Sequence, residues 1–238
     1  MNDFIHFSEV CPERKETWAS RRILSVDIDW ASDDVLNDTI DLIESFHVKA
    51  CFFVTHRTVL LEKIRANPLF EVGLHPNFDP LLLGRGSTSA KHIIADLAEF
   101  VPGARILRSH AMTTSGRWLD LYKDFGITHL SNYLMFGDSL IHPFRQLNGL
   151  IESPVYFADD GMLYQRQNSI ASLDIRDGFG ACGNGLQVFN FHPIHLFINT
   201  DDLQKYSLAR IAGDDASRLR SLRHPGDGAR AWLANLLS

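Results

Sequence analysis

The sequence lacks long apolar runs, paired cysteines and clusters of basic residues. No stretch approaches the roughly 20 apolar residues of a membrane-spanning helix, and residues 1–22 contain no continuous apolar segment typical of secretion signals. The cysteines Cys11, Cys51 and Cys182 are odd in number and far apart, which disfavours a disulfide framework or a zinc clasp. The formal net charge is −6 and lysine and arginine do not cluster, which disfavours a nucleic-acid surface. We therefore expect a cytoplasmic protein with reduced cysteines, no membrane insertion and no nucleic-acid partner.

The chain of 238 residues, 45% of them hydrophobic, is long enough for one large core, and no internal linker stands out. The predicted strands are 22–30, 50–55, 70–75, 104–110, 128–132, 153–158 and 186–191, and the predicted helices are 32–46, 58–66, 90–100, 115–125 and 231–237. Regular alternation implies parallel strands, so we predict an α/β fold with a single (β/α) barrel, incomplete or distorted, rather than an open doubly wound sheet. We assign residues 1–21 to an N-terminal extension, 22–215 to the barrel, and 216–238 to a C-terminal tail whose helix packs on the barrel.

Two aspartates, Asp27 and Asp29, end the first predicted strand. Side chains alternate between the faces of a strand, so both carboxylates point the same way while Val26 and Ile28 pack on the opposite side. The carboxyl ends of buried strands are where α/β sheets place their ligands, and paired buried carboxylates are costly unless a cation or proton compensates them. The pair therefore predicts a metal site, with a plain strand end before the helix at Asp33 as the alternative.

Other predicted strands also end in ionisable side chains, which would converge in a barrel. They are His75 and Asp79, Arg108 and His110, Asp159 and Asp160, and His192 and His195. One carboxylate, one imidazole and one further oxygen or nitrogen ligand can hold a divalent ion and leave positions open for water and substrate. We predict Asp29, His75 and Asp79 in these roles, with Asn77 as a further candidate. A core histidine at position 75 and a turn residue at position 79 are the alternatives.

The first two motifs resemble those of the polysaccharide deacetylases with a NodB homology domain, also called carbohydrate esterase family 4. That family ends its first strand with a base aspartate and a metal aspartate, which Asp27 and Asp29 resemble. Its second motif is a His-x-x-x-His metal pair after a glycine-containing strand. Residues 71–80 have this frame, with His75 as the first ligand and Asp79 where the second histidine is usual.

The later motifs of the family also have counterparts in the chain. Arg108 begins a segment that resembles an Arg-x-Pro motif orienting the base, with His110 in place of the proline. His192 follows an apolar strand in the way of the general-acid histidine of the family, and we assign it that role in preference to His195. Asp159 lies in the region of the fourth motif, where an acidic residue often supports the site. His110, Asp159 and His195 are therefore expected to line the site, together with Asn77.

The resemblance covers about residues 22–196 and is closest to deacetylase-like proteins of surface-polysaccharide clusters, such as those for O-antigen biosynthesis. It implies a seven-stranded barrel and a metal-dependent hydrolase that removes an N-acetyl or N-formyl group from an amino sugar in a polysaccharide or its precursor. Asp27 would be the general base, Arg108 would keep it ionised, and His192 would be the general acid. The metal is expected to be zinc, with manganese, magnesium, cobalt or nickel as alternatives because Asp79 is a harder ligand.

Two other functions stay open on the sequence. A deacetylase-like protein that binds a carbohydrate without hydrolysing it would explain Asp79. The Asp-x-Asp motif also opens phosphatases with an aspartate nucleophile, but those need a suitably placed lysine, which neither Lys49 nor Lys63 provides. Arg108 in a structural salt bridge and His192 as a rim residue are the corresponding structural alternatives. The sequence does not indicate an oligomeric state.

Overall fold

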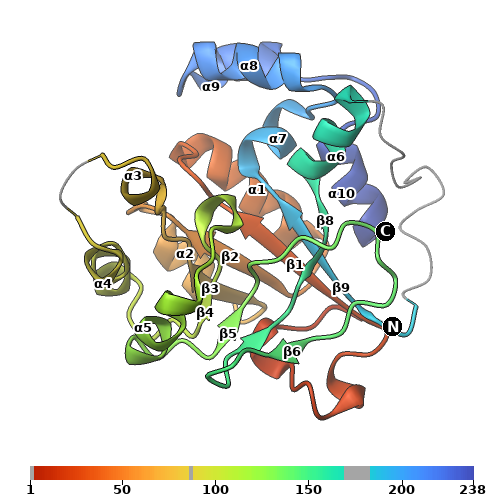
Figure 1. The fold of residues 1–238 in the computed structure, drawn as a ribbon. Helices are drawn as coiled ribbons and strands as arrows, with labels where there is room; N and C mark the ends of the chain where they lie inside the picture. The colour runs from red at the N-terminus through yellow and green to blue at the C-terminus, as the bar shows by residue number, and fades with distance from the viewer. Residues whose placement is uncertain (1–2, 86–87, 169–182) are drawn as a thin grey trace.

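Nine strands form one curled sheet at the centre of the molecule (Figure 1). The computed structural model describes residues 3–85, 88–168 and 183–238. The strands in these ranges are β1 (Arg21–Asp27), β2 (Ala50–Val54), β3 (Phe70–Leu74), β4 (Ile106–Leu107), β5 (His129–Leu130), β6 (Phe144–Arg145), β7 (Ile151–Glu152), β8 (Val155–Ala158) and β9 (Leu186–Phe191). Their order is β6-β7-β5-β4-β3-β2-β1-β9-β8, and all paired strands are parallel except β6 and β7.

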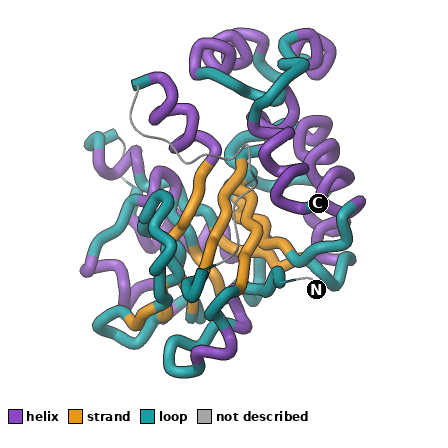
Figure 2. The backbone as a smooth tube through the Cα atoms, turned by 90° about the vertical axis from the view of Figure 1, so that its right-hand side faces the viewer, coloured by secondary structure: helices purple, strands orange, loops and turns teal. Residues whose placement is uncertain are grey.

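Helices surround the sheet, as Figure 2 shows from the side. The α-helices are α1 (Asp33–Ser45), α2 (Leu61–Ala66), α3 (Asp79–Leu82), α4 (Ala90–Phe100), α5 (Leu119–Asp124), α6 (Asp159–Gln167), α7 (Pro193–Ile198), α8 (Leu203–Ala212), α9 (Ala216–Ser221) and α10 (Ala229–Leu237). Short 3₁₀ helices are Phe7–Glu9, Lys15–Thr17, His110–Met112 and Gly116–Trp118. Helix α1 buries Leu36, Ile40 and Ile43 on one face, as its helical spacing predicts. Within the described ranges, no helix is both long enough and apolar enough to cross a bilayer.

The sheet curls until its far parts approach each other. Strand β1 lies between β2 and β9, and the chain beyond β5 returns to β8, where Leu134 pairs with Val155. The Met135 N–H donates to the Val155 carbonyl at 2.8 Å. The predicted α/β fold with a distorted barrel is therefore confirmed. The implied count of seven strands is not, since nine strands are present in the described residues.

The inner face of β1 changes from apolar to polar along the strand. Leu24 and Val26 belong to the core under α1, whereas Ile23 packs in a second, inner cluster with Phe53. The N-terminal extension fills this inner cluster, because the buried Phe7 ring lies 5.7 Å from the Phe53 ring in an edge-to-face contact. Since side chains alternate, the next residues of β1 on the inner face are Ser25 and Asp27. The apolar inner cluster with Ile23 and Phe53 thus ends next to the polar residues of β1.

Several elements differ from the sequence-based predictions. Strands β4 and β5 contain two residues each, and α6 to α9 were not predicted. Asp159 and Asp160, which follow the predicted strand 153–158, form the first turn of α6. Helix α8 buries only Ala209, so it carries no apolar stripe that the sequence could reveal. The thiols of Cys11 and Cys51 are free, and Cys182 lies outside the described residues.

The buried carboxyl of Glu152 on β7 should make stability depend on pH. Burial outweighs hydrogen bonds from the Asn132 N–H and Gln146, and it raises the pKa of Glu152 from 4.5 to about 7. An unfolded chain releases this proton at lower pH, so stability falls as the pH rises from about 4.5 to about 7, by on the order of 3 kcal/mol. We expect Glu152→Gln to remove this loss.

Urea unfolding of Glu152→Gln and the wild type at pH 5 and pH 8 measures the effect. The exposed Glu62→Gln is the control and should not change the pH dependence. The prediction would be contradicted if the free energy of unfolding changed by the same amount between pH 5 and pH 8 in the Glu152 variant and in the wild type.

Candidate functional site

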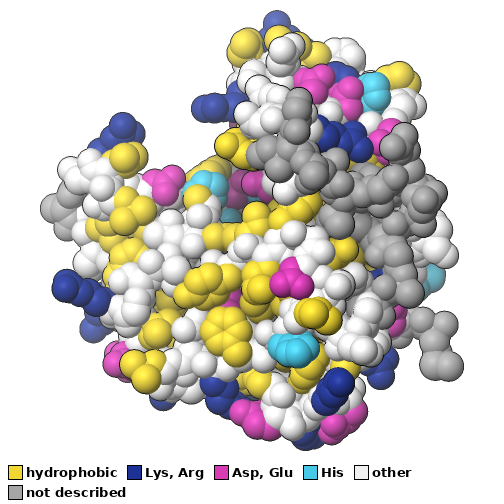
Figure 3. All heavy atoms as spheres, turned by 45° about the vertical axis from the view of Figure 1, so that its right-hand side comes forward, with side chains coloured by type: hydrophobic (Ala, Val, Ile, Leu, Met, Phe, Trp, Pro, Cys, Tyr) yellow, Lys and Arg dark blue, Asp and Glu magenta, His cyan; other side chains and the backbone are white. Residues whose placement is uncertain are grey.

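Polar side chains gather in a cavity of about 590 Å³ at the carboxyl ends of the central strands. Asp27 ends β1, His75 follows β3, His192 follows β9, and Asp29 and His110 lie on adjoining loops. Figure 3 shows a hollow in which histidine and acidic side chains are visible. The predicted convergence of strand ends at one site is therefore present.

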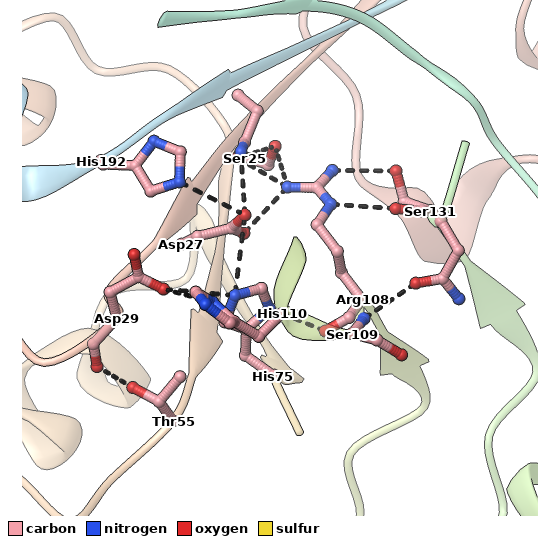
Figure 4. Close-up of polar contacts among 12 residues, drawn as sticks. Ser25, Asp27, Asp29, Thr55, His75, Arg108, Ser109, His110, Ser131 and His192 are labelled. Carbon is pink, nitrogen blue, oxygen red and sulfur yellow. Dashed lines mark hydrogen bonds and ion pairs between the residues drawn. The ribbon is translucent and has the colours of Figure 1, made fainter. Parts of the chain in front are cut away.

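Arg108 is a fully buried charged group of this site and lies directly after β4. Its Nη1 donates to Asp27 Oδ1 at 2.9 Å and to Asn190 Oδ1 at 2.6 Å (Figure 4). Its Nε and Nη2 donate to the carbonyl and hydroxyl of Ser131 at 3.0 and 2.8 Å. The guanidinium also stacks over the Phe53 ring at 4.3 Å. These contacts fix the cation beside Asp27.

Asp27 is held as a buried carboxylate. Oδ1 accepts from Arg108, and Oδ2 accepts from Asn190 Nδ2 at 2.8 Å. Oδ2 also lies 3.8 Å from His75 Nε2 and 3.9 Å from His192 Nε2. Burial alone would raise the pKa of Asp27, but the Arg108 charge, aided by the two histidines, outweighs it and lowers that pKa. Asp27 is therefore ionised near neutral pH.

Asp29 adopts a left-handed backbone conformation, with φ of +44°. A non-glycine residue with such a φ is strained and persists only where its surroundings hold it. Here the Asp29 carbonyl accepts from the Thr55 hydroxyl and lies 2.8 Å from His56 Nδ1. Burial would raise the pKa of Asp29, but hydrogen bonds with His110 and His75 outweigh it and lower that pKa. The turn thus directs a charged carboxylate at two imidazoles.

Asp29, His75 and His110 form a group that fits a divalent metal ion. Each offers one ligand atom, and these atoms lie within 4.8 Å of one another. Asp29 Oδ1 is 3.4 Å from His75 Nε2 and 3.2 Å from His110 Nδ1. His75 Nδ1 donates to the Arg108 carbonyl at 2.7 Å, and this contact turns Nε2 toward Asp29. A carbonyl bond of this kind orients metal-ligating histidines, and one oxygen with two nitrogens is a common donor set for zinc.

Asp79 is not part of this group. It is the first residue of α3, and its N–H donates to the side-chain oxygen of Asn77 at 2.9 Å. The Asn77 oxygen is thus engaged in capping, and neither residue lines the cavity. The hydrogen bond with Asp29 raises the pKa of His110, and the Asp79 charge adds to that effect through space. The structure therefore brings His110 to the place that we predicted for Asp79.

His192 forms a close pair with Asp159. Its Nδ1 lies 2.6 Å from Asp159 Oδ1, and its backbone N–H donates to Asp159 Oδ2 at 2.8 Å. Burial would lower the pKa of His192, but the Asp159 charge and hydrogen bond outweigh it and raise that pKa well above its usual value. Nε2 is left facing Asp27. Asp159, predicted only to line the site, thus orients the imidazole and keeps it protonated.

His195 lies behind His192 on α7. Its Nδ1 is 3.0 Å from the Thr200 hydroxyl, and burial lowers its pKa. Asp159, His192 and His195 form a second group with ligand atoms within 4.8 Å. Two of the ligand atoms of this group, Asp159 Oδ1 and His192 Nδ1, already contact each other at 2.6 Å. His195 is best described as a neutral residue of the cavity wall.

Two residues that contribute to the site, Asn190 and Ser25, were not predicted from the sequence. Asn190 binds both Arg108 and Asp27, and Ser25 accepts from Arg108. Each is a polar residue on the inner face of an otherwise apolar strand, two positions before His192 or Asp27. A polar residue two positions before a predicted site residue, and therefore on the same face of the strand, was the sequence feature that could have pointed to them. His110 had a signal too, because it replaces the proline of the third motif.

The metal group makes a direct prediction about ion content. We expect Asp29→Ala, His75→Ala and His110→Ala each to weaken metal binding by tenfold or more, since each removes one of three ligands. Asp79→Ala should retain the metal. Elemental analysis of the purified variants, with zinc titration after chelation, provides the measurement. Loss of metal in Asp79→Ala with retention in His110→Ala would reverse the ligand assignment.

The chain is similar to a known protein family and to solved structures. A family model described as WbmS-like polysaccharide deacetylase matches residues 24–210. A crystal structure of a Bordetella bronchiseptica protein assigned as a polysaccharide deacetylase involved in O-antigen biosynthesis (WbmS) is 35% identical, over 99% of this chain and 97% of that chain, with a TM-score of 0.91. A Mycobacterium smegmatis protein assigned as a polysaccharide deacetylase is 16% identical over 89% and 93% of the two chains, with a TM-score of 0.49. No curated protein matches the chain.

Proposed function

Because the chain belongs to the WbmS-like polysaccharide deacetylases, we propose that it is a metal-dependent amide hydrolase that removes an N-acyl group from an amino sugar. The single observation that carries the proposal is the placement of ionised Asp27 and protonated His192, 3.9 Å apart, beside the group of Asp29, His75 and His110. General-base and general-acid groups with opposed protonation states are what amide hydrolysis requires.

The reaction converts an amide and water into a carboxylate and an amine. Asp29, His75 and His110 would hold the ion, which supplies a Lewis acid that polarises the acyl carbonyl and makes water more acidic. Asp27 Oδ2 takes the proton from the attacking water, since it faces the cavity between two imidazoles. Arg108 keeps Asp27 ionised at the start of the cycle. His192 Nε2 donates a proton to the leaving amine, with Asp159 stabilising the imidazolium.

The other functions are less well supported. An aspartate nucleophile needs a free carboxylate oxygen and a nearby lysine, whereas both oxygens of Asp27 accept hydrogen bonds. No lysine lines the described walls of the cavity. A binding protein without turnover would not need an oriented, protonated His192.

We further propose an O-antigen precursor as the substrate and a cytoplasmic location, because the Bordetella relative is assigned to O-antigen biosynthesis. We keep the division into an extension (1–21), a barrel (22–215) and a tail (216–238) as part of this proposal.

The test is hydrolysis by metal-loaded protein. N-acetyl and N-formyl amino sugars, offered free, nucleotide-linked and in oligosaccharides, are incubated with the protein, and released carboxylate is quantified by proton NMR. We expect turnover that stops on chelation, resumes with added metal and is lost in His75→Ala. The absence of carboxylate release from every substrate by metal-loaded wild type would refute the proposal.

Asp159→Asn should move the alkaline limit of the reaction. The carboxylate raises the pKa of His192, so its neutralisation lowers that pKa and activity disappears at lower pH as the imidazole loses its proton. We expect the alkaline limb of the kcat profile to move to lower pH. Asp124→Asn is the control, because Asp124 is an exposed carboxylate at the end of α5 that does not line the cavity, and it should leave the alkaline limb in place. A lowered rate with an unchanged profile would mean that Asp159 acts by packing alone.

A further inference from the structure

A second cavity, of about 330 Å³, adjoins the candidate active site. Asp29, His110 and His192 line both cavities, and Tyr206 lies at the same junction. The remaining walls come from the loop after β1, the start of α1, and helices α7 to α9. A substrate whose amide lies at the reacting groups therefore has room to extend beyond them into this second cavity.

The surface that the second cavity offers to a ligand is aromatic and polar. Four of its aliphatic residues are buried beneath that surface, with at most 2% of their area exposed: Ile28, Val35, Ala209 and Leu219. The exposed lining includes Trp30, Arg210 and Asp214, and Ser32 and Tyr206 are half-buried beside them. A ligand in this cavity would thus meet an indole, a phenol, a guanidinium and a carboxylate.

Trp30 is the exposed one of the four tryptophans in the chain, with 54% of its surface accessible. Trp18 and Trp232 are buried, and Trp118 is half-buried. The Trp30 ring meets the His110 ring edge to face at 5.0 Å. The indole is therefore held beside the group that fits the metal, at the wall of the second cavity.

The charged side chains of this cavity are free to bind a ligand. Arg210 on α8 and Asp214 just after it form no ion pair or side-chain hydrogen bond with any residue in the described ranges. A sugar ring has a face of C–H groups, which an aromatic π-system attracts, and a rim of hydroxyls, which need donors and acceptors. An aliphatic ligand would instead cover both charges without forming hydrogen bonds to them. The lining therefore fits a sugar ring.

We propose that this cavity is a subsite for a second sugar, so that the enzyme acts on an amino sugar within an oligosaccharide in preference to a free monosaccharide. A cavity of about 150 Å³ accommodates benzene, so about 330 Å³ leaves space for a six-membered ring with its hydroxyls. Trp30 determines the preference by stacking on the neighbouring sugar, and Arg210 and Asp214 bind the hydroxyls of that sugar. The proposal rests on the hydrolase function argued above and specifies its substrate class.

Turnover of N-acetylglucosamine and of its chitin dimer and trimer by metal-loaded protein measures what the second sugar contributes. We expect kcat/KM to rise with chain length, and Trp30→Ala to lower it by roughly two- to tenfold for the dimer and trimer but less for the monosaccharide. Trp30→Phe keeps an aromatic ring and should retain part of the gain. Phe144→Ala is the matched control, since Phe144 is an exposed aromatic residue on β6 that lines neither cavity.

A binding measurement tests the subsite without turnover. Acrylamide quenches the fluorescence of exposed tryptophans, so the trimer should protect Trp30 from acrylamide in metal-loaded Asp27→Asn. The same variant with Trp30→Phe added should show little protection, because the other three tryptophans do not line the cavity. Thermal melting and elemental analysis of each variant verify folding and metal content, since Trp30 contacts His110.

Each outcome bears on a different part of the argument. An equal loss on the monosaccharide and the trimer in Trp30→Ala would mean that Trp30 acts only through His110, and it overturns the subsite. Turnover without a gain from chain length and without protection also overturns the subsite but leaves the hydrolase function standing. Protection without turnover of any substrate supports the subsite and refutes the hydrolase function. The absence of both turnover and protection overturns both proposals.

Discussion

Asp27→Asn is expected to lower kcat by about a thousandfold while the protein still binds its metal. Oδ2 of Asp27 lies 3.8 Å from His75 Nε2 and 3.9 Å from His192 Nε2, and Asp27 lies outside the group that fits the ion. Asparagine keeps the shape and can accept from Arg108, but it cannot take a proton from water. The expected loss therefore falls on kcat, with KM changed much less.

The comparison needs a check on folding and on metal content. Neutralising Asp27 leaves Arg108 without its counter-ion, so thermal melting and elemental analysis accompany the kinetics. Asp34→Asn is a matched control because Asp34 is an exposed carboxylate on α1, and it should retain the wild-type rate. Turnover within tenfold of wild type in folded, metal-loaded Asp27→Asn would remove the general base from the mechanism.

Much of this site could be predicted from the sequence, because strand patterns and family motifs depend on residues that are close together in the chain. Period-two alternation placed Asp27 on the inner face of β1, and the ends of parallel strands had to converge. Asp29 lies beyond the end of the strand and reaches the site through a turn with φ of +44°, which alternation did not predict. His75, Arg108 and His192 accordingly lie where the sequence put them. The general-acid and general-base roles stay predictions, since geometry alone does not test them.

The third member of the metal group shows what sequence could not provide. Asp79 has the spacing from His75 that the second metal ligand of the family has. In the structure, however, Asp79 and Pro80 begin α3, and the Asp79 N–H donates to the side-chain oxygen of Asn77 in the turn before the helix. His110 reaches Asp29 from another loop, in which Ala111 and Met112 have positive φ values. A backbone path of that kind is set by tertiary packing, and no local pattern signals it.

Asp159 was undervalued for a similar reason. An Asp-Asp-Gly sequence after a strand is typical of a turn, so Asp159 was expected only to line the site. In the structure it begins α6, where carboxylates are favoured by the helix dipole, and the same residue meets His192 across 33 residues of sequence. Only the three-dimensional structure shows that Asp159, the first residue of α6, also pairs with His192.

Arg108 joins the separate halves of the site, because it touches strands on both sides of the barrel. It binds Asp27 and Ser25 on β1, Asn190 on β9 and Ser131 after β5. Its carbonyl orients His75 as well. One residue therefore sets the charge of the base and the direction of a metal ligand.

Arg108→Met is expected to lower the free energy of unfolding by about 3–5 kcal/mol at neutral pH, because it leaves Asp27 as an unpaired buried charge. Asp27→Asn combined with Arg108→Met removes both charges and should recover a large part of that loss, with a coupling free energy of roughly 2–3 kcal/mol. Urea unfolding of the chelated proteins measures both values. Arg57→Met, which breaks an exposed ion pair with Glu99, is the control and should cost less than about 1 kcal/mol.

The pH dependence of this loss separates a charge effect from a packing effect. In the wild type the pKa of Asp27 is lowered, so its contribution to stability is present above the unfolded-state pKa and is lost in acid. Without Arg108, burial dominates and raises that pKa, so the unpaired carboxylate takes up a proton in mild acid. The deficit of Arg108→Met should therefore be smaller at pH 5 than at pH 8. A deficit that is equal at both pH values, with no recovery in the double variant, would mean that Arg108 stabilises the barrel through its volume and not through Asp27.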